Sequence, residues 1–330
     1  MENRIKEQFT DEILREITSR FGLDFSETKE IDAFENFVFI SKKDSQKYIL
    51  RISHTIRRLK EQVVSELEFL DYLHTNNLNV PKVFRSKENN LVEEVKGEGG
   101  NFLACIFEFI EGKVPVENLR TNELSYQMGK YLGTFHRLTT KYKPTVRHRQ
   151  TFFEVTVPLF DWIPETDKKV RKIADETLNI IRNIPKNDTN YGLIHGDFHF
   201  GNFLLRDEKI VLFDFDDCQY SWFVHDIAMS LFYYLPINER NEKVTEDGHA
   251  FLRNYLRGYR EVFTLNEEML PYIETFMKSR ELELYALVHR SFDIDNLPEW
   301  PRDFMKGRKE KIERGEPFFA VDMKKIIDEK

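Results

Sequence analysis

The sequence predicts an α+β protein with two parts, a smaller strand-rich part followed by a larger helical part. Between residues 34 and 110, short apolar runs of strand length recur. Beyond residue 112, longer segments with apolar residues every three or four positions predominate, which is the helical period. A chain of 330 residues is also long enough for two cores. We therefore expect domains over residues 1–111 and 112–330, with the boundary at 110–113.

The first part begins with a helical pattern. Apolar residues recur every four positions from Ile5 to Phe21, which predicts one helix that ends near Gly22. The elements expected next are strands over 34–41 and 48–53, a helix over 59–75, and strands over 91–95 and 101–110. The turn at 43–45 would join the first two strands into an antiparallel hairpin.

In the second part, helical patterns cover residues 124–139 and 166–184, and Pro185 ends the latter. A polar loop at 195–202 and an apolar strand at 210–215 follow. From Asp226 onward, helical patterns continue to the end of the chain. This order places a loop rich in functional side chains between helices of the larger part.

Composition excludes several classes of function. The formal net charge of −8 argues against a nucleic-acid partner, because nucleic-acid binders carry a basic excess. Two cysteines are too few for a disulfide framework or a cysteine metal site. The N-terminus is charged, and the apolar run at 102–110 is too short to cross a bilayer. We expect a cytoplasmic protein without a membrane partner.

The most informative stretch is His195-Gly-Asp-Phe-His-Phe-Gly-Asn202, followed by an apolar run that ends in Asp214-Phe-Asp216. A single aspartate in a turn is usually only a turn former. Here a loop carboxylate, an amide five positions later and a carboxylate after the next apolar run occur together. Phosphoryl transfer needs a group that orients the attacking hydroxyl and oxygen ligands for Mg²⁺. The combination therefore favours a catalytic role for this stretch over a purely structural turn.

This stretch resembles the catalytic loop and metal-binding strand of the aminoglycoside phosphotransferase and choline kinase family, which are small-molecule kinases. The resemblance implies a two-lobe, protein-kinase-like fold. Its N-lobe would be a small antiparallel, nucleotide-binding sheet, and its mostly helical C-lobe would carry the catalytic loop and the acceptor site. It implies that Asp197 is catalytic and that Asn202 and Asp214 bind Mg²⁺. Asp216 would reach a second metal ion, and Asp226 would tie the catalytic loop to a helix.

The resemblance also implies a nucleotide site. Arg51 stands on a strand where many relatives carry the lysine that holds the α- and β-phosphates, and its helix partner would be Glu66 or the competing Glu68. Asn36 keeps the last element of the phosphate loop at 31–37, which lacks glycine.

Between the lobes, the segment that ends at Gly112 resembles the family's hinge. There the carbonyl of Glu108 and the amide of Ile110 would bind the purine.

The expected function is transfer of the γ-phosphate of ATP or GTP to a hydroxyl of a small molecule, such as an aminoglycoside, an amino-alcohol or homoserine. A non-catalytic nucleotide-binding pseudokinase and a protein Ser/Thr kinase are the alternatives. The acceptor would bind near the loop at 236–248 or a helix over 272–290, on which carboxylates and an aromatic ring suit a cation. The side chains of that helix expected to share a face are Glu274, Lys278, Glu281 and Tyr285.

Overall fold

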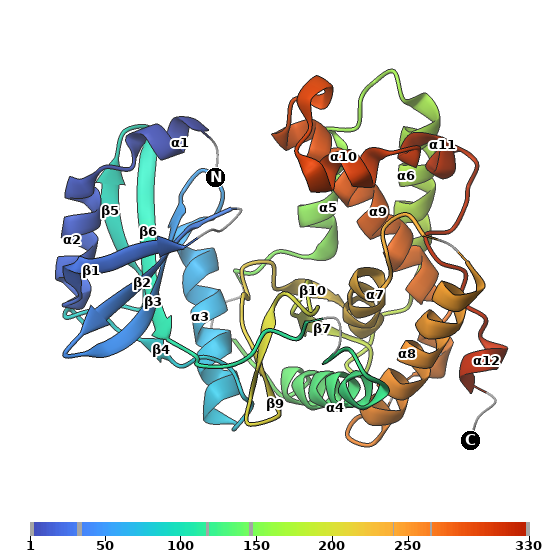
Figure 1. Cartoon of the computed structure of the whole chain (residues 1–330), viewed down its shortest axis with the longest axis horizontal. Helices are drawn as coiled ribbons and strands as arrows, with labels where there is room; N and C mark the ends of the chain where they lie inside the picture. The colour runs from blue at the N-terminus through green and yellow to red at the C-terminus, as the bar shows by residue number, and fades with distance from the viewer. Residues whose placement is uncertain are drawn as a thin grey trace. The chain divides into compact units, whose positions relative to one another are not determined.

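A computed structural model describes residues 3–31, 35–116, 119–144, 148–239, 241–264 and 266–327. The chain divides into two compact units (Figure 1). The first unit holds Met1–Lys113, Tyr142–Arg149 and Leu204–Asp216, and the second holds Val114–Lys141, Gln150–Phe203 and Asp217–Lys330. Two segments that follow residue 112 thus pack with the first unit. A division into functional domains at 111 and 112 stays a prediction.

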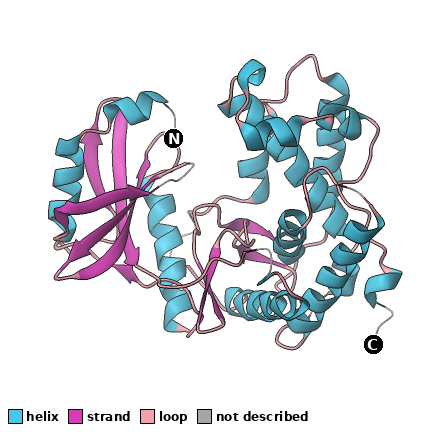
Figure 2. Ribbon diagram, in the orientation of Figure 1, coloured by secondary structure: helices cyan, strands magenta, loops and turns pink. Residues whose placement is uncertain are grey.

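The first unit is built on an antiparallel sheet with the order β1-β2-β3-β6-β4, in which β5 also pairs with β6 (Figure 2). Its strands are β1 (Asp24–Ile31), β2 (Phe37–Lys43), β3 (Gln46–His54), β4 (Val83–Phe84), β5 (Glu93–Gly97) and β6 (Gly100–Glu108). Its helices are α1 (Asn3–Gln8), α2 (Asp11–Phe21) and α3 (Lys60–Thr75). Apolar side chains of α2 and of the sheet form one core, which includes Leu14, Ile17, Phe21, Leu50, Ile52 and Phe102.

The sequence-based expectations hold for most of this unit, with two exceptions. The helix expected to run to Phe21 is divided in two, because Thr10 is an N-cap that starts α2 and accepts a hydrogen bond from the N–H of Ile13. The edge strand β1 was not expected. Its residues are mostly exposed, so its sequence lacks the alternation of apolar and polar side chains that signals a strand.

A hairpin of β8 (Phe203–Arg206) and β9 (Lys209–Leu212) is attached to the first unit by backbone hydrogen bonds. Lys113 and Leu205 exchange two such bonds of 2.9 Å, and the N–H of Leu212 donates to the carbonyl of Asn79 over 3.1 Å. The segment after β9, with Asp214 and Asp216, is thereby held against strands and helices of the same unit.

The second unit is mostly helical. Its helices are α4 (Asn122–Thr139), α5 (Phe152–Phe160), α6 (Lys168–Arg182), α7 (Phe223–Tyr234), α8 (Glu242–Arg260), α9 (Tyr272–Ser291), α10 (Glu299–Met305), α11 (Arg308–Glu313) and α12 (Lys324–Ile327), with short 3₁₀ turns at Glu267–Met269 and Ile294–Asn296. Strands β7 (Tyr191–Ile194) and β10 (Gln219–Trp222) form an antiparallel pair. The helices expected at 124–139 and 166–184 are present as α4 and α6.

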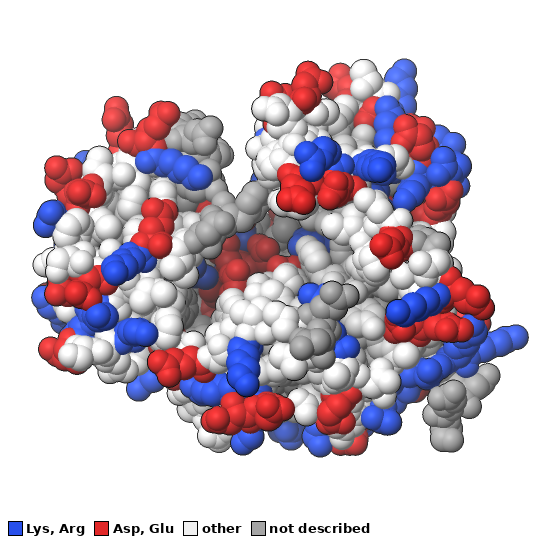
Figure 3. Space-filling view, viewed as in Figure 1, with Lys and Arg blue, Asp and Glu red and all other residues white. Residues whose placement is uncertain are grey.

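Among the described residues, no helix has both the length and the hydropathy to span a bilayer. Acidic and basic side chains are interspersed over the surface of each unit in the view of Figure 3.

Helices α4 and α8 pack so closely that glycine is required at their contact. A Cβ added at Gly129 would lie 1.8 Å from the carbonyl oxygen of Tyr255, and one at Gly258 would lie 2.0 Å from that of Tyr126. Backbone atoms cannot swing aside as a side chain can. This contact fixes α4, which carries His136, a residue of the candidate site.

We expect Gly129→Ala to lower the free energy of unfolding by about 3 kcal/mol, because the added methyl group forces the two helix backbones apart. Urea denaturation followed by circular dichroism measures the effect. The control is Lys130→Ala, an exposed position of the same helix, which should change stability by less than about 1 kcal/mol. Equal midpoints for the two variants would contradict the close packing.

Candidate active site

The loop at 195–202 follows β7 in the second unit and is held by one buried carboxylate. Asp226, in the first turn of α7, accepts hydrogen bonds from the backbone N–H groups of His195 over 3.0 Å and Gly196 over 2.7 Å. The ring Nε2 of His136 lies 3.1 Å from the same side chain. Burial would raise the pKa of Asp226, but these contacts hold it below its usual value. The loop is therefore tied to a helix through Asp226, as the resemblance implied.

Gly196 gives the loop its sharp turn. Its φ of +83° lies in the left-handed region, and a Cβ there would meet the carbonyl oxygen of Asp217 at 2.7 Å. Because only glycine fits at this position, the residue after it, Asp197, leaves the turn in a fixed direction.

Both carboxylate oxygens of Asp197 are engaged within the second unit. Oδ1 accepts a hydrogen bond from Arg280 Nη2 over 3.0 Å. Oδ2 accepts one from Asn202 Nδ2 over 2.9 Å and lies 3.2 Å from His199 Nε2. Burial raises the pKa of Asp197, but the charges of His199 and Arg280 outweigh it and hold the pKa well below its usual range. Asp197 is therefore ionised at neutral pH.

The structure brings Asn202 directly against Asp197. Its Nδ2 donates to both the backbone carbonyl and the carboxylate of Asp197, each over 2.9 Å. Since the amide nitrogen is used in this way, the amide oxygen Oδ1 is the atom that Asn202 has to offer a metal ion.

Asp214 and Asp216 belong to the first unit and differ in environment. Asp214 is exposed and has a φ of +61°, a conformation that is uncommon for residues other than glycine and that clusters at functional sites. Asp216 is buried, and its carboxylate lies 3.3 Å from Arg57 Nη2 and 3.5 Å from Arg58 Nε. Burial raises the pKa of Asp216, but the charges of Arg58, Arg51 and Arg57 hold it well below its usual range.

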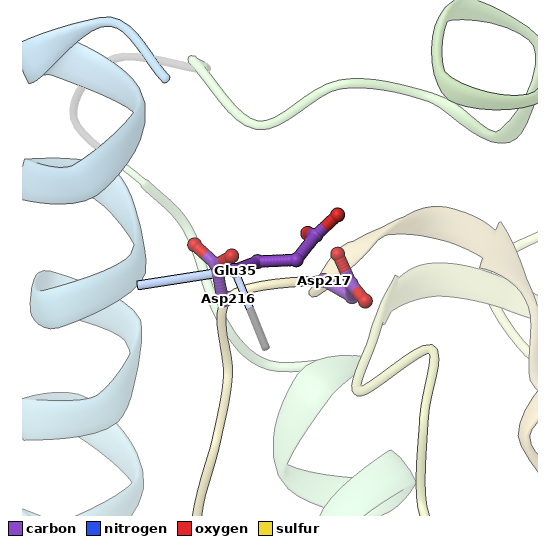
Figure 4. Close-up of side chains that lie close together, drawn as sticks. All are labelled: Glu35, Asp216 and Asp217. Carbon is purple, nitrogen blue, oxygen red and sulfur yellow. The ribbon is translucent and has the colours of Figure 1, made fainter. Parts of the chain in front are cut away.

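Arg57 joins the end of the expected phosphate loop to Asp216. Its Nη1 donates to the carbonyl of Glu35 over 2.7 Å and to Asn36 Oδ1 over 3.5 Å, and its Nη2 pairs with the Glu35 carboxylate. Asn36 Nδ2 in turn donates to Asp216 over 3.5 Å. Figure 4 shows Glu35 and Asp216 together with Asp217, the next residue of the chain. A carboxylate oxygen of Glu35 lies within 4.8 Å of one of Asp216, and Arg57 balances both charges.

Arg57 and Arg58 were not expected at the site, because arginines in a strand–helix connection carry no motif. Residues 32–34 of the expected phosphate loop lie outside the described residues.

Arg51 forms a buried ion pair with Glu66. The two terminal nitrogens of Arg51 donate to the two carboxylate oxygens over 2.7 and 2.8 Å, and the side chains are 7% and 0% exposed. Glu68 is exposed, so the helix partner of Arg51 is Glu66. Among the described residues, the Nε of Arg51 is buried without a hydrogen-bond partner. The pair is the arrangement that the resemblance implied for a phosphate-binding cation.

Glu108 ends β6 at the expected hinge. Its N–H donates to the carbonyl of Lys82 over 2.8 Å, and its carboxylate lies 3.2 Å from Arg206 Nη1. Ile110 follows in an irregular, half-buried segment.

The side chains of α9 expected to share a face toward a cationic acceptor take part in internal contacts of the second unit, and acceptor binding there stays a prediction. Glu281 accepts hydrogen bonds from Lys278 over 2.6 Å and from Arg308 over 2.7 Å, and the hydroxyl of Tyr285 donates to Asp167 over 2.6 Å. Glu274 accepts a bond from the N–H of Val321.

Arg280, another residue of α9, reaches the catalytic loop instead. Sequence reasoning missed it, because nothing local links position 280 to position 197.

Comparison with known proteins identifies the family. The model of a family described as "Phosphotransferase enzyme family" matches residues 27–269, which is more than half of the chain. The chain belongs to the phosphotransferase enzyme family. It is 35% identical over 332 residues to the amicoumacin kinase of Bacillus subtilis (strain 168), and the match covers 98% of each protein. The expected family is thereby confirmed, and with it a kinase that transfers phosphate from a nucleoside triphosphate to a hydroxyl group of a small molecule.

Solved structures confirm the protein-kinase-like fold. An amicoumacin kinase in complex with AMP-PNP, Ca²⁺ and Ami matches with a TM-score of 0.91 at 28% identity, over 98% of both chains. A microcompartment-associated aminopropanol kinase matches with a TM-score of 0.73 at 18% identity, over 93% of this chain and 98% of the other. The second likeness concerns the fold alone.

We expect Glu66→Gln to lower the free energy of unfolding by about 3 kcal/mol, because it leaves the buried charge of Arg51 unbalanced. Chemical denaturation measures the loss. Glu68→Gln on the same helix is the matched control and should stay within about 0.5 kcal/mol of the unsubstituted protein, since Glu68 is exposed. A similar loss in both variants would contradict the assignment of Glu66 as the partner.

Proposed function

We propose that this kinase moves the γ-phosphate of ATP or GTP to a hydroxyl of a small acceptor, and that Asp197 orients that hydroxyl. The observation that carries the proposal is the Asp197 carboxylate, held on both oxygens on a loop that Asp226 fixes. The acceptor hydroxyl donates its hydrogen bond to Asp197. As the new O–P bond forms and the bond to the leaving nucleoside diphosphate breaks, the hydroxyl proton passes to the carboxylate.

The low pKa of Asp197 makes it a weak base, and this suits the reaction. Phosphoryl transfer passes through a loose transition state in which the attacking hydroxyl forms little bond to phosphorus, so orientation matters more than early removal of the proton. Asp197 therefore acts first by alignment and accepts the proton late.

Asn202 and Asp214 are the residues that we propose to hold Mg²⁺. The donor set fits a hard cation, because Asn202 offers an amide oxygen and Asp214 an exposed carboxylate. When bound, the ion neutralises charge on the nucleotide phosphates. Asp216, the third proposed ligand, would have to exchange its contacts with Arg57 and Arg58 for a second ion.

The nucleotide site that we propose lies in the first unit. Arg51, positioned by Glu66, would hold the α- and β-phosphates. Asn36 would contact phosphate, while the carbonyl of Glu108 and the amide of Ile110 would bind the purine. The absence of a nucleic-acid partner and a cytoplasmic location stay predictions from the sequence.

For the acceptor, the likeness to amicoumacin kinases over the whole chain makes amicoumacin the first compound to test. A panel with aminopropanol, homoserine and spectinomycin covers compounds named for other relatives. Transfer of phosphate from ATP or GTP to one of these compounds supports the proposal. Nucleotide binding by calorimetry with no transfer to any acceptor and no hydrolysis would favour a non-catalytic protein.

We expect Asp197→Asn to lower kcat by about 10³-fold, because an amide neither accepts the proton nor carries the charge that orients the hydroxyl. The rate is measured as release of nucleoside diphosphate. Asp175→Asn, at an exposed position of α6, is the control and should keep full activity. Comparable rates for Asp197→Asn and the control would refute the role of Asp197.

Removal of divalent metal ions with EDTA should abolish transfer, and added Mg²⁺ should restore it. In Asp214→Asn the Mg²⁺ concentration for half-maximal rate should rise at least about 10-fold, because a charged ligand becomes neutral. Asp207→Asn is the matched control, since Asp207 is also exposed and also has a positive φ, which asparagine tolerates. An unchanged Mg²⁺ requirement in Asp214→Asn would exclude Asp214 as a ligand.

A further inference from the structure

Helix α9 places a guanidinium group directly on the proposed catalytic carboxylate. Arg280 Nη2 donates to Asp197 Oδ1 over 3.0 Å, and both side chains are 19% exposed. The two residues are 83 positions apart in the sequence, and both belong to the second unit. The contact therefore joins the catalytic loop to the helix over 272–291 through a charge-assisted hydrogen bond.

Arg280 is itself held in place from several sides. Its Nε and Nη2 donate to the hydroxyl oxygen of Tyr233 over 3.0 and 2.6 Å, and Nη1 lies 3.4 Å from Glu283 Oε2. Glu283 is fixed in turn by hydrogen bonds from the hydroxyl groups of Thr156 over 3.1 Å and Ser279 over 3.0 Å. The guanidinium group has little freedom to leave Asp197.

Tyr233 links the two sides of this network. Its ring lies 4.3 Å from that of His199, centre to centre, and His199 contacts the other oxygen of Asp197. A planar guanidinium can reach Tyr233, Asp197 and Glu283 at once, which a lysine ammonium on a flexible stem cannot do with the same geometry.

We propose that Arg280 is a positioning residue that sets the orientation of the Asp197 carboxylate for phosphoryl transfer. This inference rests on the proposed function of Asp197. The terminal torsion of an aspartate is broad, so a carboxylate held on one oxygen alone can rotate. Asn202 and His199 hold Oδ2, and Arg280 supplies the hold on Oδ1. Loss of this hold misplaces the group that aligns the acceptor, and it leaves the proposed nucleotide-binding residues of the first unit unchanged.

The test compares Arg280→Ala and Arg280→Lys with the unsubstituted enzyme. The readouts are transfer to amicoumacin, hydrolysis of MgATP by water, which needs no identified acceptor, and ATP affinity by calorimetry. We expect kcat to fall by about 10²-fold in Arg280→Ala for both reactions, with ATP affinity unchanged. Added guanidinium ion should restore part of the rate of Arg280→Ala, whereas Arg280→Lys should stay impaired because it lacks the planar fork.

Two further variants complete the design. Tyr233→Phe removes the hydroxyl group that anchors Arg280 and leaves Arg280 itself in the chain, so it should lower kcat by less than Arg280→Ala does. It also serves as the test if Arg280→Ala fails to fold. Arg290→Ala, at an exposed position of the same helix, is the matched control and should keep full activity.

The outcomes separate this inference from the proposed function. If the unsubstituted enzyme is active and folded Arg280→Ala has the same kcat, the role of Arg280 alone is overturned. If Arg280→Ala does not fold, an unchanged kcat in Tyr233→Phe overturns it in the same way. A parallel loss of ATP affinity, or a lost rate that guanidinium ion does not restore, also overturns it. Failure of the unsubstituted enzyme both to hydrolyse MgATP and to transfer phosphate to any compound of the acceptor panel overturns the proposed function itself.

Discussion

The geometry of the candidate site depends on the buried carboxylate of Asp226. This one side chain accepts two backbone N–H groups of the catalytic loop and contacts His136 of α4, and it is fully excluded from solvent. A buried charge is costly unless hydrogen bonds satisfy it, so the loop has one favourable conformation, the one that supplies its N–H groups to Asp226. The left-handed turn at Gly196 then sets the direction of Asp197.

Charge pairing also organises the first unit, where the expected phosphate loop has no glycine. Arg51 pairs with Glu66, Arg57 pairs with both Glu35 and Asp216, and Arg58 also pairs with Asp216. Each of these ion pairs links separate segments of the chain. Loops rich in glycine approach phosphate with their backbone, which requires positive φ angles and small residues. Here, side chains from the β3–α3 connection fix the described end of the loop instead.

The sequence was sufficient where the signal is local. The loop at 195–202, in which Asn202 contacts Asp197, lies within one short stretch, and α4 and α6 follow from their apolar period. It was insufficient where the partner is distant. Choosing Glu66 over Glu68 depends on which side of α3 faces β3, which periodicity alone left open. Arg280 meets Asp197 only through the packing of α9. Helix α5 was not expected from the sequence, because its residues are mostly apolar and partly β-branched. Its best helix signal, the capping box of Thr151 and Glu154, is short.

The contacts of Asp197 show how one carboxylate is suited to alignment. A strong base would have to be partly desolvated and unpaired, and it would then be protonated for part of the time at neutral pH. Arg280, His199 and Asn202 instead keep Asp197 ionised and fix both of its oxygens. In the proposed reaction, this arrangement would lower the basicity, which matters least in a loose transition state, and secure the orientation, which matters most. Since the Oδ1 contact comes from α9 and the Oδ2 contacts come from the loop, the packing of the helix on the loop is itself part of the proposed catalytic geometry.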